Sequence, residues 1–321
     1  MKFLKNQLLI LQANDLLIIS FAFFLTIINL IFLDRVSNWA NHVALNIVVI
    51  TLIFIIANMD KPGKGIFWEQ LHYWYMVPIV FLSFKEIYFM VQPIRGIDYD
   101  QYLIQIDRFI FGGDPTYFLY SFANPFLTEL LQIVYGSFFF LPIILGIDIM
   151  INKNDKYFRY MTFTIILGFF LSYIGYFIVP AVGPRFTLHD FSLTNIELPG
   201  LFLTNFLREI VNAGESIPAG TSNPIEVVQR DVFPSGHTQI TLIVMYLSIR
   251  LKTVTRYIFI PVGTLLIFST VYLRYHYVID LLAGLVFMVV TVLFSQKLFN
   301  WWINVKGEAP FEYPHYAKEK K

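Results

Sequence analysis

The sequence predicts an all-α fold, a polytopic membrane helical bundle with about eight transmembrane helices. Of its 321 residues, 57% are hydrophobic and 14% are charged, and the mean hydropathy is +0.62. A soluble domain has nearer a quarter of its residues charged. The 34 Phe and 19 Tyr suit lipid-facing helices with aromatic belts at the membrane interfaces. Continuous apolar runs argue against a β-barrel, whose strands alternate apolar and polar residues.

The composition also excludes some classes of function. With a net charge of +1, the chain has no strongly basic surface that would indicate a nucleic-acid partner. Without any Cys, it can form no disulfide and perform no thiolate chemistry.

The predicted spans are segments that meet or approach the ~20 mostly apolar residues that cross a bilayer. They are residues 16–33, 40–57, 73–91, 126–150, 160–179, 238–251, 257–272 and 277–299. The sixth and seventh are short because sequence motifs occupy their ends.

Basic residues in the short connections predict the orientation, because Lys and Arg concentrate on the cytoplasmic side. With the spans above, these residues fall on one side: Lys2, Lys5, Lys61, Lys64, Lys153, Lys156, Arg159, Arg250, Lys252, Arg256, Lys306, Lys318, Lys320 and Lys321. Both termini should therefore be cytoplasmic. The long segments 92–125 and 181–233 should lie on the opposite side, and 201–211 could form a short interfacial helix.

Three polar motifs, whose side chains are suited to catalysis or ligand binding, lie on that opposite side. They are residues 183–190 (GPRFTLHD), 233–238 (FPSGHT) and 269–280 (STVYLRYHYVID). In the second motif, Pro234 suits a helix start, and Gly236 lets a ligand approach the backbone closely. Free N–H groups of the first helical turn, with the helix dipole, favour a bound phosphate, and His237 would lie beside it.

The third motif combines a nucleophile with a group that can orient it. His276 and Asp280 are spaced i, i+4 and share one helix face. Asp280 can accept the ring N–H of His276, which fixes the tautomer and raises the basicity of the ring. Arg185 and Arg274 supply planar guanidinium groups for phosphate oxygens, and His189 is a further candidate.

These motifs resemble those of the type 2 phosphatidic acid phosphatase (PAP2) superfamily. Residues 234–237 match its Pro-Ser-Gly-His motif in full, and residues 272–284 match its His- and Asp-containing motif in register. The resemblance implies that His276 attacks phosphorus to form a phosphohistidine, Asp280 orients it, and His237 protonates the leaving oxygen. It also implies phosphate contacts from Ser235 and Gly236, and no metal or other cofactor.

The resemblance covers roughly residues 126–299, which predicts a PAP2-like catalytic membrane core. Residues 1–125 would then add N-terminal transmembrane helices and an interfacial segment, and residues 300–321 would form a cytoplasmic tail. The active site would face the outer or luminal side, where it would meet a lipid substrate in the bilayer.

The chain departs from the family pattern at two places. Thr270 stands where the family's third motif has Arg, and Ile178 stands where the first motif has Lys. The GPR sequence at 183–185, the downstream His189 and the additional spans look more like the inositol-phosphorylceramide synthase branch, and residues 107–115 share this likeness. The resemblance to that branch favours transfer of a phospho-headgroup between lipids. A lipid phosphate phosphatase, or a transporter that retains the fold, remains an alternative.

Two groups of charged residues have open interpretations. Lys85 and Glu86, inside the third span, could line a headgroup path or form a structural ion pair with other spans. The carboxylates Asp98, Asp100, Asp107 and Asp114 could suggest a metal, but a solvated interfacial segment is the favoured interpretation. In that segment, Asp114 would cap the helix that begins at Pro115.

Overall fold

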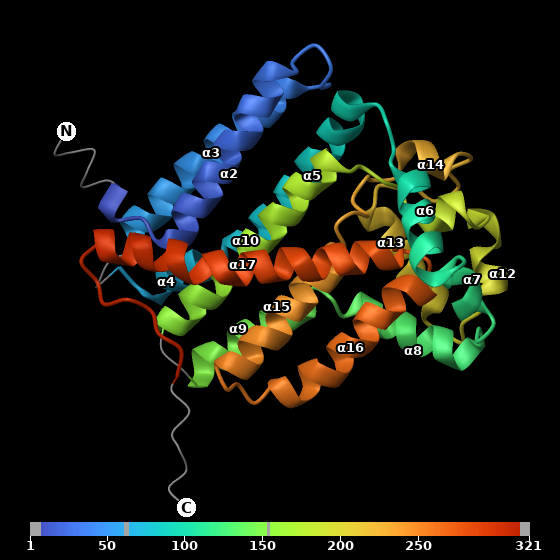
Figure 1. Ribbon diagram of the computed structural model, residues 1–321. Coiled ribbons are helices and arrows are strands. Elements are labelled where there is room, and N and C mark those ends of the chain that lie inside the picture. Colours follow the sequence, from blue (N-terminus) through green and yellow to red (C-terminus); the bar gives the residue numbers. More distant parts are fainter. Residues whose placement is uncertain (1–7, 61–63, 153–154, 315–321) are drawn as a thin grey trace, which may run out of the picture.

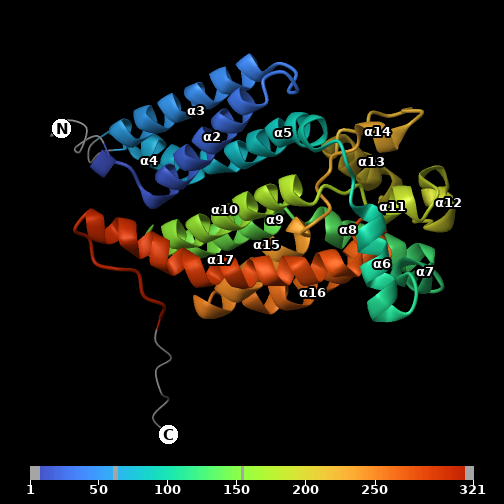
Figure 2. The same cartoon turned by 45° about the horizontal axis from the view of Figure 1, so that its top comes forward.

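The computed structural model describes residues 8–60, 64–152 and 155–314, and across these ranges every regular element is a helix. Several of the basic residues used to predict the orientation lie outside the described residues: Lys2, Lys5, Lys61, Lys153, Lys318, Lys320 and Lys321. Figures 1 and 2 show a bundle of long helices with shorter helices gathered at one end. The all-α membrane bundle predicted from the sequence is confirmed.

The long helices form an N-terminal group and a core group. The N-terminal group is α2 (Ala13–Ile31), α3 (Trp39–Met59), α4 (Ile66–Trp74) and α5 (Met76–Arg95). The core group is α8 (Pro125–Gly136), α9 (Phe140–Asn152), α10 (Asp155–Ile178), α15 (Gly236–Arg250), α16 (Arg256–Tyr272) and α17 (Val278–Val305).

Shorter helices close the end of the bundle where α5 and α10 finish (Figure 1). The segment between α5 and α8 forms α6 (Asp100–Phe111) and α7 (Pro115–Tyr120). The segment between α10 and α15 forms α11 (Pro184–Thr187), η1 (Phe191–Leu193), α12 (Thr194–Glu197), α13 (Thr204–Gly214) and α14 (Pro224–Val227). We call these two segments together the cap. The predicted interfacial helix at 201–211 corresponds to α13.

Each predicted span overlaps a helix, but a count of about eight spans is not confirmed. Five described stretches are long and apolar enough to cross a membrane: 13–31, 39–59, 66–95, 155–178 and 278–305. The pair α8 and α9, bent by 54°, can make a sixth. The remaining two predicted spans fall on α15 and α16, which have 15 and 17 residues. These helices fall short of the ~20 residues of a full span, and α15 begins inside the Pro-Ser-Gly-His motif.

Helix α10 occupies the centre of the bundle, where it packs on α2, α5, α9, α15 and α17. Its most apolar stretch is 78% buried, against 22% for that of α17, whose outward face is left for lipid. Small residues allow the close contacts: a Cβ at Gly168 of α10 would lie 2.6 Å from the Ile243 side chain on α15.

Polar side chains join the N-terminal helices within the apolar bundle. The Glu86 carboxylate on α5 is buried and accepts hydrogen bonds from Asn29 of α2 (2.8 Å) and Asn46 of α3 (2.9 Å). Lys85 instead donates to the Gly214 carbonyl (2.6 Å) and the Ser216 hydroxyl (2.9 Å). Glu86 thus links three helices, whereas Lys85 attaches α5 to the cap.

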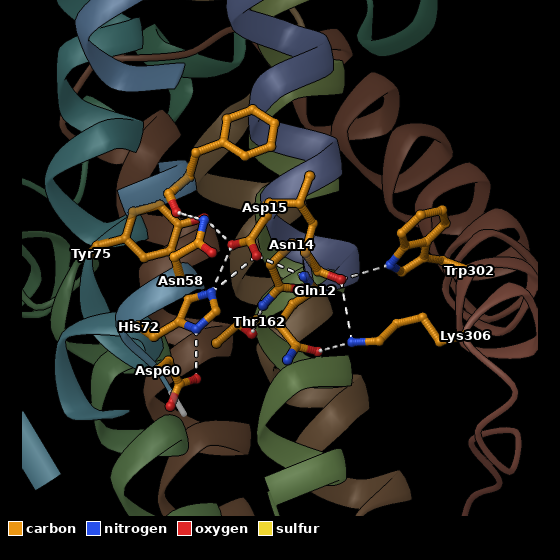
Figure 3. A network of polar contacts seen from close by, with 12 residues as sticks. Gln12, Asn14, Asp15, Asn58, Asp60, His72, Tyr75, Thr162, Trp302 and Lys306 are labelled. Atoms are coloured by element: carbon orange, nitrogen blue, oxygen red, sulfur yellow. Dashed lines mark hydrogen bonds and ion pairs between the residues drawn. The ribbon is translucent and has the colours of Figure 1, made fainter. Parts of the chain in front are cut away.

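A second polar network lies at the end of the bundle away from the cap (Figure 3). The His72 ring, on α4, places Nδ1 2.7 Å from Asp60 and Nε2 3.0 Å from Asp15. Tyr75 donates to Asp15 (2.6 Å), and the neighbouring Asn14 donates to Thr162 of α10 (2.7 Å). Because both ring nitrogens face carboxylates, the ring acts as a double donor, which describes an imidazolium.

We expect His72→Ala to destabilise the protein by about 3 kcal/mol or more, because it leaves Asp15 buried without its counter-charge. Thermal unfolding in detergent would measure the loss. Phe67→Ala, on the same helix but 66% exposed, serves as the matched control and should change the unfolding temperature little. Equal unfolding temperatures for the two variants would contradict this role for His72.

Candidate active site

The Pro-Ser-Gly-His motif is clamped between α10 and α17. Ser235 caps α15, and its hydroxyl oxygen accepts the Thr238 N–H at 3.2 Å, while its own N–H donates to the Asp280 carbonyl at 3.0 Å. A Cβ at Gly236 would lie 2.6 Å from the Tyr176 hydroxyl of α10, and one at Gly284 would lie 2.8 Å from the Ser235 carbonyl oxygen. Glycine suits both positions because the Tyr176 side chain approaches Gly236 closely and the Ser235 backbone approaches Gly284 closely.

His276 lies in the short turn between α16 and α17. The turn is made by Arg274, whose φ of 67° is left-handed, and by the Thr270 carbonyl, which accepts the Tyr275 and His276 N–H groups at 2.9 and 3.1 Å. At the start of α17, Asp280 accepts the Tyr277 N–H at 2.7 Å. The i, i+4 pair therefore straddles a helix start that fixes both side chains.

The His276 Nδ1 atom has two acceptors beside it. The Val232 carbonyl lies at 3.0 Å and the Asp280 Oδ2 atom at 3.5 Å. The sequence indicated Asp280 as acceptor, and the structure adds a nearer backbone carbonyl from the segment before the Pro-Ser-Gly-His motif. With Nδ1 held as the donor, Nε2 carries the free lone pair of the neutral ring. Burial, with His237 and Arg185 nearby, lowers the pKa of His276 well below its ordinary value, which keeps the ring neutral.

His237 is brought next to His276, with ring centroids 5.7 Å apart in an edge-to-face arrangement. Its ring packs on Tyr135 at 4.6 Å and Phe138 at 4.3 Å, and Tyr135 stacks in turn on Tyr275 at 4.4 Å. These packed aromatic rings orient the His237 imidazole. The sequence analysis missed Tyr135 because an aromatic residue inside an apolar helix carries no sequence signal that separates it from its neighbours.

Arg185 is buried beside the histidines at the start of α11. Its N–H donates to the Arg274 carbonyl at 3.1 Å, and its guanidinium lies 4.8 Å from the Tyr275 ring centroid. Two groups of the cap bind that guanidinium: Glu215 by an ion pair and Asn212 by a hydrogen bond of 3.1 Å. A phosphate oxygen is an acceptor of the same kind.

Arg274 contacts residues of the cap. Its buried guanidinium pairs with Glu197 of α12 and lies 5.0 Å from the Tyr120 ring centroid of α7. His189 is also part of the cap, and its Nε2 lies 2.8 Å from the Thr116 hydroxyl. Burial and the charge of Arg274 lower the pKa of His189 to about 4. Arg185 and Arg274 thus bind different acidic residues of the cap, Glu215 and Glu197.

Two acidic residues of α6 hold the motifs in place. Asp100 accepts the N–H groups of Val182 (3.0 Å) and Gly183 (2.8 Å) and the Tyr277 hydroxyl (2.8 Å). Asp107 accepts the first N–H groups of α17, both at 2.8 Å. Both carboxylates are buried and bind backbone N–H groups of the motifs, so the interpretation of this segment as solvated is wrong for these two residues.

The remaining acids of this segment form ion pairs. Asp98 pairs with Arg230 at 3.3 Å. Asp114 stands at the N-cap of α7 as predicted, but its carboxylate binds Arg108 at 2.7 Å, and no side-chain capping bond forms. Among the described residues, these acids form no group of three or more ligands that could hold a metal ion.

Asp231 is an acidic residue that the sequence analysis overlooked. It lies in the same pocket as Gly236 and His237, close to Arg185. Burial raises the pKa of Asp231 to about 6, and the charge of Arg185 acts in the opposite direction. The only sequence signal for Asp231 is its position, three residues before Pro234.

The site thus combines the buried His276, the partly buried His237, a helix N-terminus and the buried Arg185 inside a bundle of apolar helices. Residues 101–294 match the family model described as the PAP2 superfamily. The chain therefore belongs to the PAP2 superfamily. This membership supports a phosphatase- or phosphotransferase-type enzyme. No curated protein and no solved structure matches the chain significantly.

Proposed function

We propose that the protein transfers a phospho-headgroup from one lipid to another through a phosphohistidine, as an inositolphosphotransferase-like enzyme. The observation that carries the proposal is the pairing of His276 and His237 at 5.7 Å, with the His276 Nδ1 atom held by acceptors. Family membership supports the broader class of reaction, and the geometry supports the assignment of roles.

The reaction has two displacement steps. In the first, the His276 Nε2 lone pair attacks phosphorus, the bond from phosphorus to the leaving oxygen breaks, and His237 gives that oxygen a proton. In the second, an acceptor hydroxyl attacks the phosphohistidine, His237 takes the hydroxyl proton, and the bond from phosphorus to nitrogen breaks. Asp280 and the Val232 carbonyl stabilise the positive charge that develops on the His276 ring.

Phosphate binding is assigned to Arg185 and the start of α15. The first-turn N–H groups of Gly236 and His237 and the positive end of the helix dipole favour an anion there. Arg185 can exchange Glu215 and Asn212 for phosphate oxygens. Arg274 and His189, whose contacts lie with α7 and α12, are assigned to holding the cap or to a more distant part of the headgroup.

A polar pocket beside Arg185 favours a transferase with a hydroxylated headgroup. Its walls carry the amides of Asn195, Asn205 and Asn212 and the guanidinium of Arg208. Amides both donate and accept, as recognition of several hydroxyl groups requires. A PAP2-type lipid phosphate phosphatase, which differs only in using water as the acceptor, is the second candidate, because all other parts of the site serve both reactions.

Incubation of the purified protein with lipids labelled in the headgroup phosphate, alone and with a second lipid alcohol, tests the proposal. A new labelled lipid is the expected product, formed equally well in excess chelator because arginine and histidine side chains supply the charge. Free phosphate from a phosphate monoester would establish the phosphatase. Loss of activity in chelator, restored by Mg²⁺, would overturn the metal-free mechanism.

We further propose that the cap and active site face the outer or luminal side, with both termini in the cytoplasm. In intact cells, a membrane-impermeant thiol reagent should label Ser222→Cys, which is exposed in the cap. Val254→Cys, 71% exposed in the turn between α15 and α16, should react only after permeabilisation. The absence of native Cys makes the unmodified chain a clean control. The reverse labelling pattern would place the site in the cytoplasm.

A further inference from the structure

An apolar groove runs between the N-terminal helices and the core. Its walls include Val80 and Phe81 of α5, Phe139 and Ile143 around the α8–α9 bend, and Ile166 and Phe169 of α10. Its cavity volume is about 70 Å³, and the groove is open at the surface of the bundle. We call it the α5–α10 groove.

The groove leads to the active site. Four of its residues, Val80, Phe81, Phe139 and Phe169, also line a second apolar pocket. That second pocket ends at Gly236, His237 and Asp231. An elongated apolar molecule in the groove would therefore place one end beside the proposed proton donor.

We propose that the α5–α10 groove binds one hydrocarbon chain of the lipid substrate. This inference rests on the proposed function and specifies the place where the lipid substrate is held. The walls belong to the span 66–95, the span 155–178 and the bent α8–α9 pair, so the groove lies at the depth of the bilayer core. Phe81 and Phe139, 41% and 43% exposed, pack on each other with ring centroids 4.7 Å apart and cover the groove where it meets the surrounding lipid, so a chain enters when these rings move.

The dimensions of the groove suit a long chain. Together with the second pocket, its α10 wall runs from Met161 in the groove to Tyr176 in the second pocket. At 1.5 Å per residue, this stretch of α10 is about 22 Å long. The groove therefore matches a long fatty acyl or alkyl chain, whereas a short chain would fill only the part beside His237.

Helix α5 lies outside the residues 101–294 that match the family model. One wall of the groove is therefore contributed by the N-terminal helices that the chain has in addition to the matched region. We assign to α5, and to Val80 in particular, the selection of substrates by chain length.

Val80→Trp tests the proposal, because Val80 lies where the two pockets join. Dipalmitoyl and dihexanoyl phosphatidylinositol, with a lipid alcohol acceptor, are the probes. We expect kcat/KM to fall at least tenfold for the dipalmitoyl lipid, a loss of about 1.4 kcal/mol, and to change little for the dihexanoyl lipid. Leu82→Trp, on the same helix but 41% exposed and away from the groove, is the control and should affect neither lipid.

A measurement on the unmodified protein avoids any folding defect of the variant. A phosphatidylinositol with a photoreactive group near the end of one chain should label peptides that contain Ile143 or Ile166. Labelling confined to the lipid-facing side of α17, for example around Val286, would overturn the groove, as would equal losses for both chain lengths in Val80→Trp. Failure of the unmodified enzyme to turn over any phospholipid would instead refute the proposed function, while labelling in the groove would still support lipid binding there.

Discussion

His276→Ala should reduce turnover by at least ~10³-fold while the protein stays folded in membranes, because the side chain that attacks phosphorus is removed. The residue lies in a turn between two helices, where its ring contacts His237 and the Val232 carbonyl. The prediction has a direct chemical readout as well. A headgroup-labelled donor should leave an acid-labile, base-stable phosphoryl label on the unmodified protein and none on His276→Ala.

His42→Ala is the matched control for this experiment. His42 belongs to α3, where its ring contacts Phe89 at 5.5 Å, and it takes no part in the site. Thermal unfolding of both variants separates a lost nucleophile from a lost fold. Retention of more than a few per cent of activity in a folded His276→Ala protein would exclude the phosphohistidine mechanism.

Asp280→Asn should lower kcat by about 10²-fold or more, and less completely than His276→Ala, because the nucleophile remains. The carboxylate lies 3.5 Å from the His276 Nδ1 atom, and removing its charge destabilises the imidazolium that forms during attack. The Val232 carbonyl, at 3.0 Å, still holds the Nδ1–H tautomer and so limits the damage. KM should change little, since Asp280 does not bind the phosphate.

Asp107→Asn provides the comparison for a purely structural carboxylate. Asp107 accepts the N–H groups of Val278 and Ile279, and an amide oxygen can still accept one of these bonds. We expect a modest loss of stability and nearly normal kcat. If Asp280→Asn behaved like Asp107→Asn, with kcat intact, the orienting role of Asp280 would be wrong.

The local part of the site could be predicted from the sequence because its geometry is set within one or two helical turns. A helix that starts at Ser235-Gly236 presents its first N–H groups wherever it lies. His276 and Asp280 also meet as predicted, but across the start of α17, because His276 lies in the turn before the helix and not on the predicted shared helix face. Apolar length and charge likewise predicted a membrane bundle. Family membership follows from the same residues, since the matched region 101–294 contains both motifs.

Contacts between distant segments could not be predicted, because they depend on how the helices pack. The Val232 carbonyl next to His276 has no side-chain signature, and Arg274 is directed toward Glu197 by a left-handed turn. The number of spans was uncertain for a related reason. Helix α15 is mostly buried in the bundle and need not reach the length of a lipid-exposed span, whereas α16 is short although much of its surface is exposed.

The sequence by itself determined that this protein is a helical membrane protein that carries motifs of the PAP2 superfamily, because hydrophobicity and short-range spacing are local properties. Only the tertiary structure decided what surrounds that motif. It places α13 over Arg185 and packs α5 against α10, which leaves the apolar groove that ends at His237. These features arise from side chains far apart in the sequence that become neighbours only when the helices pack.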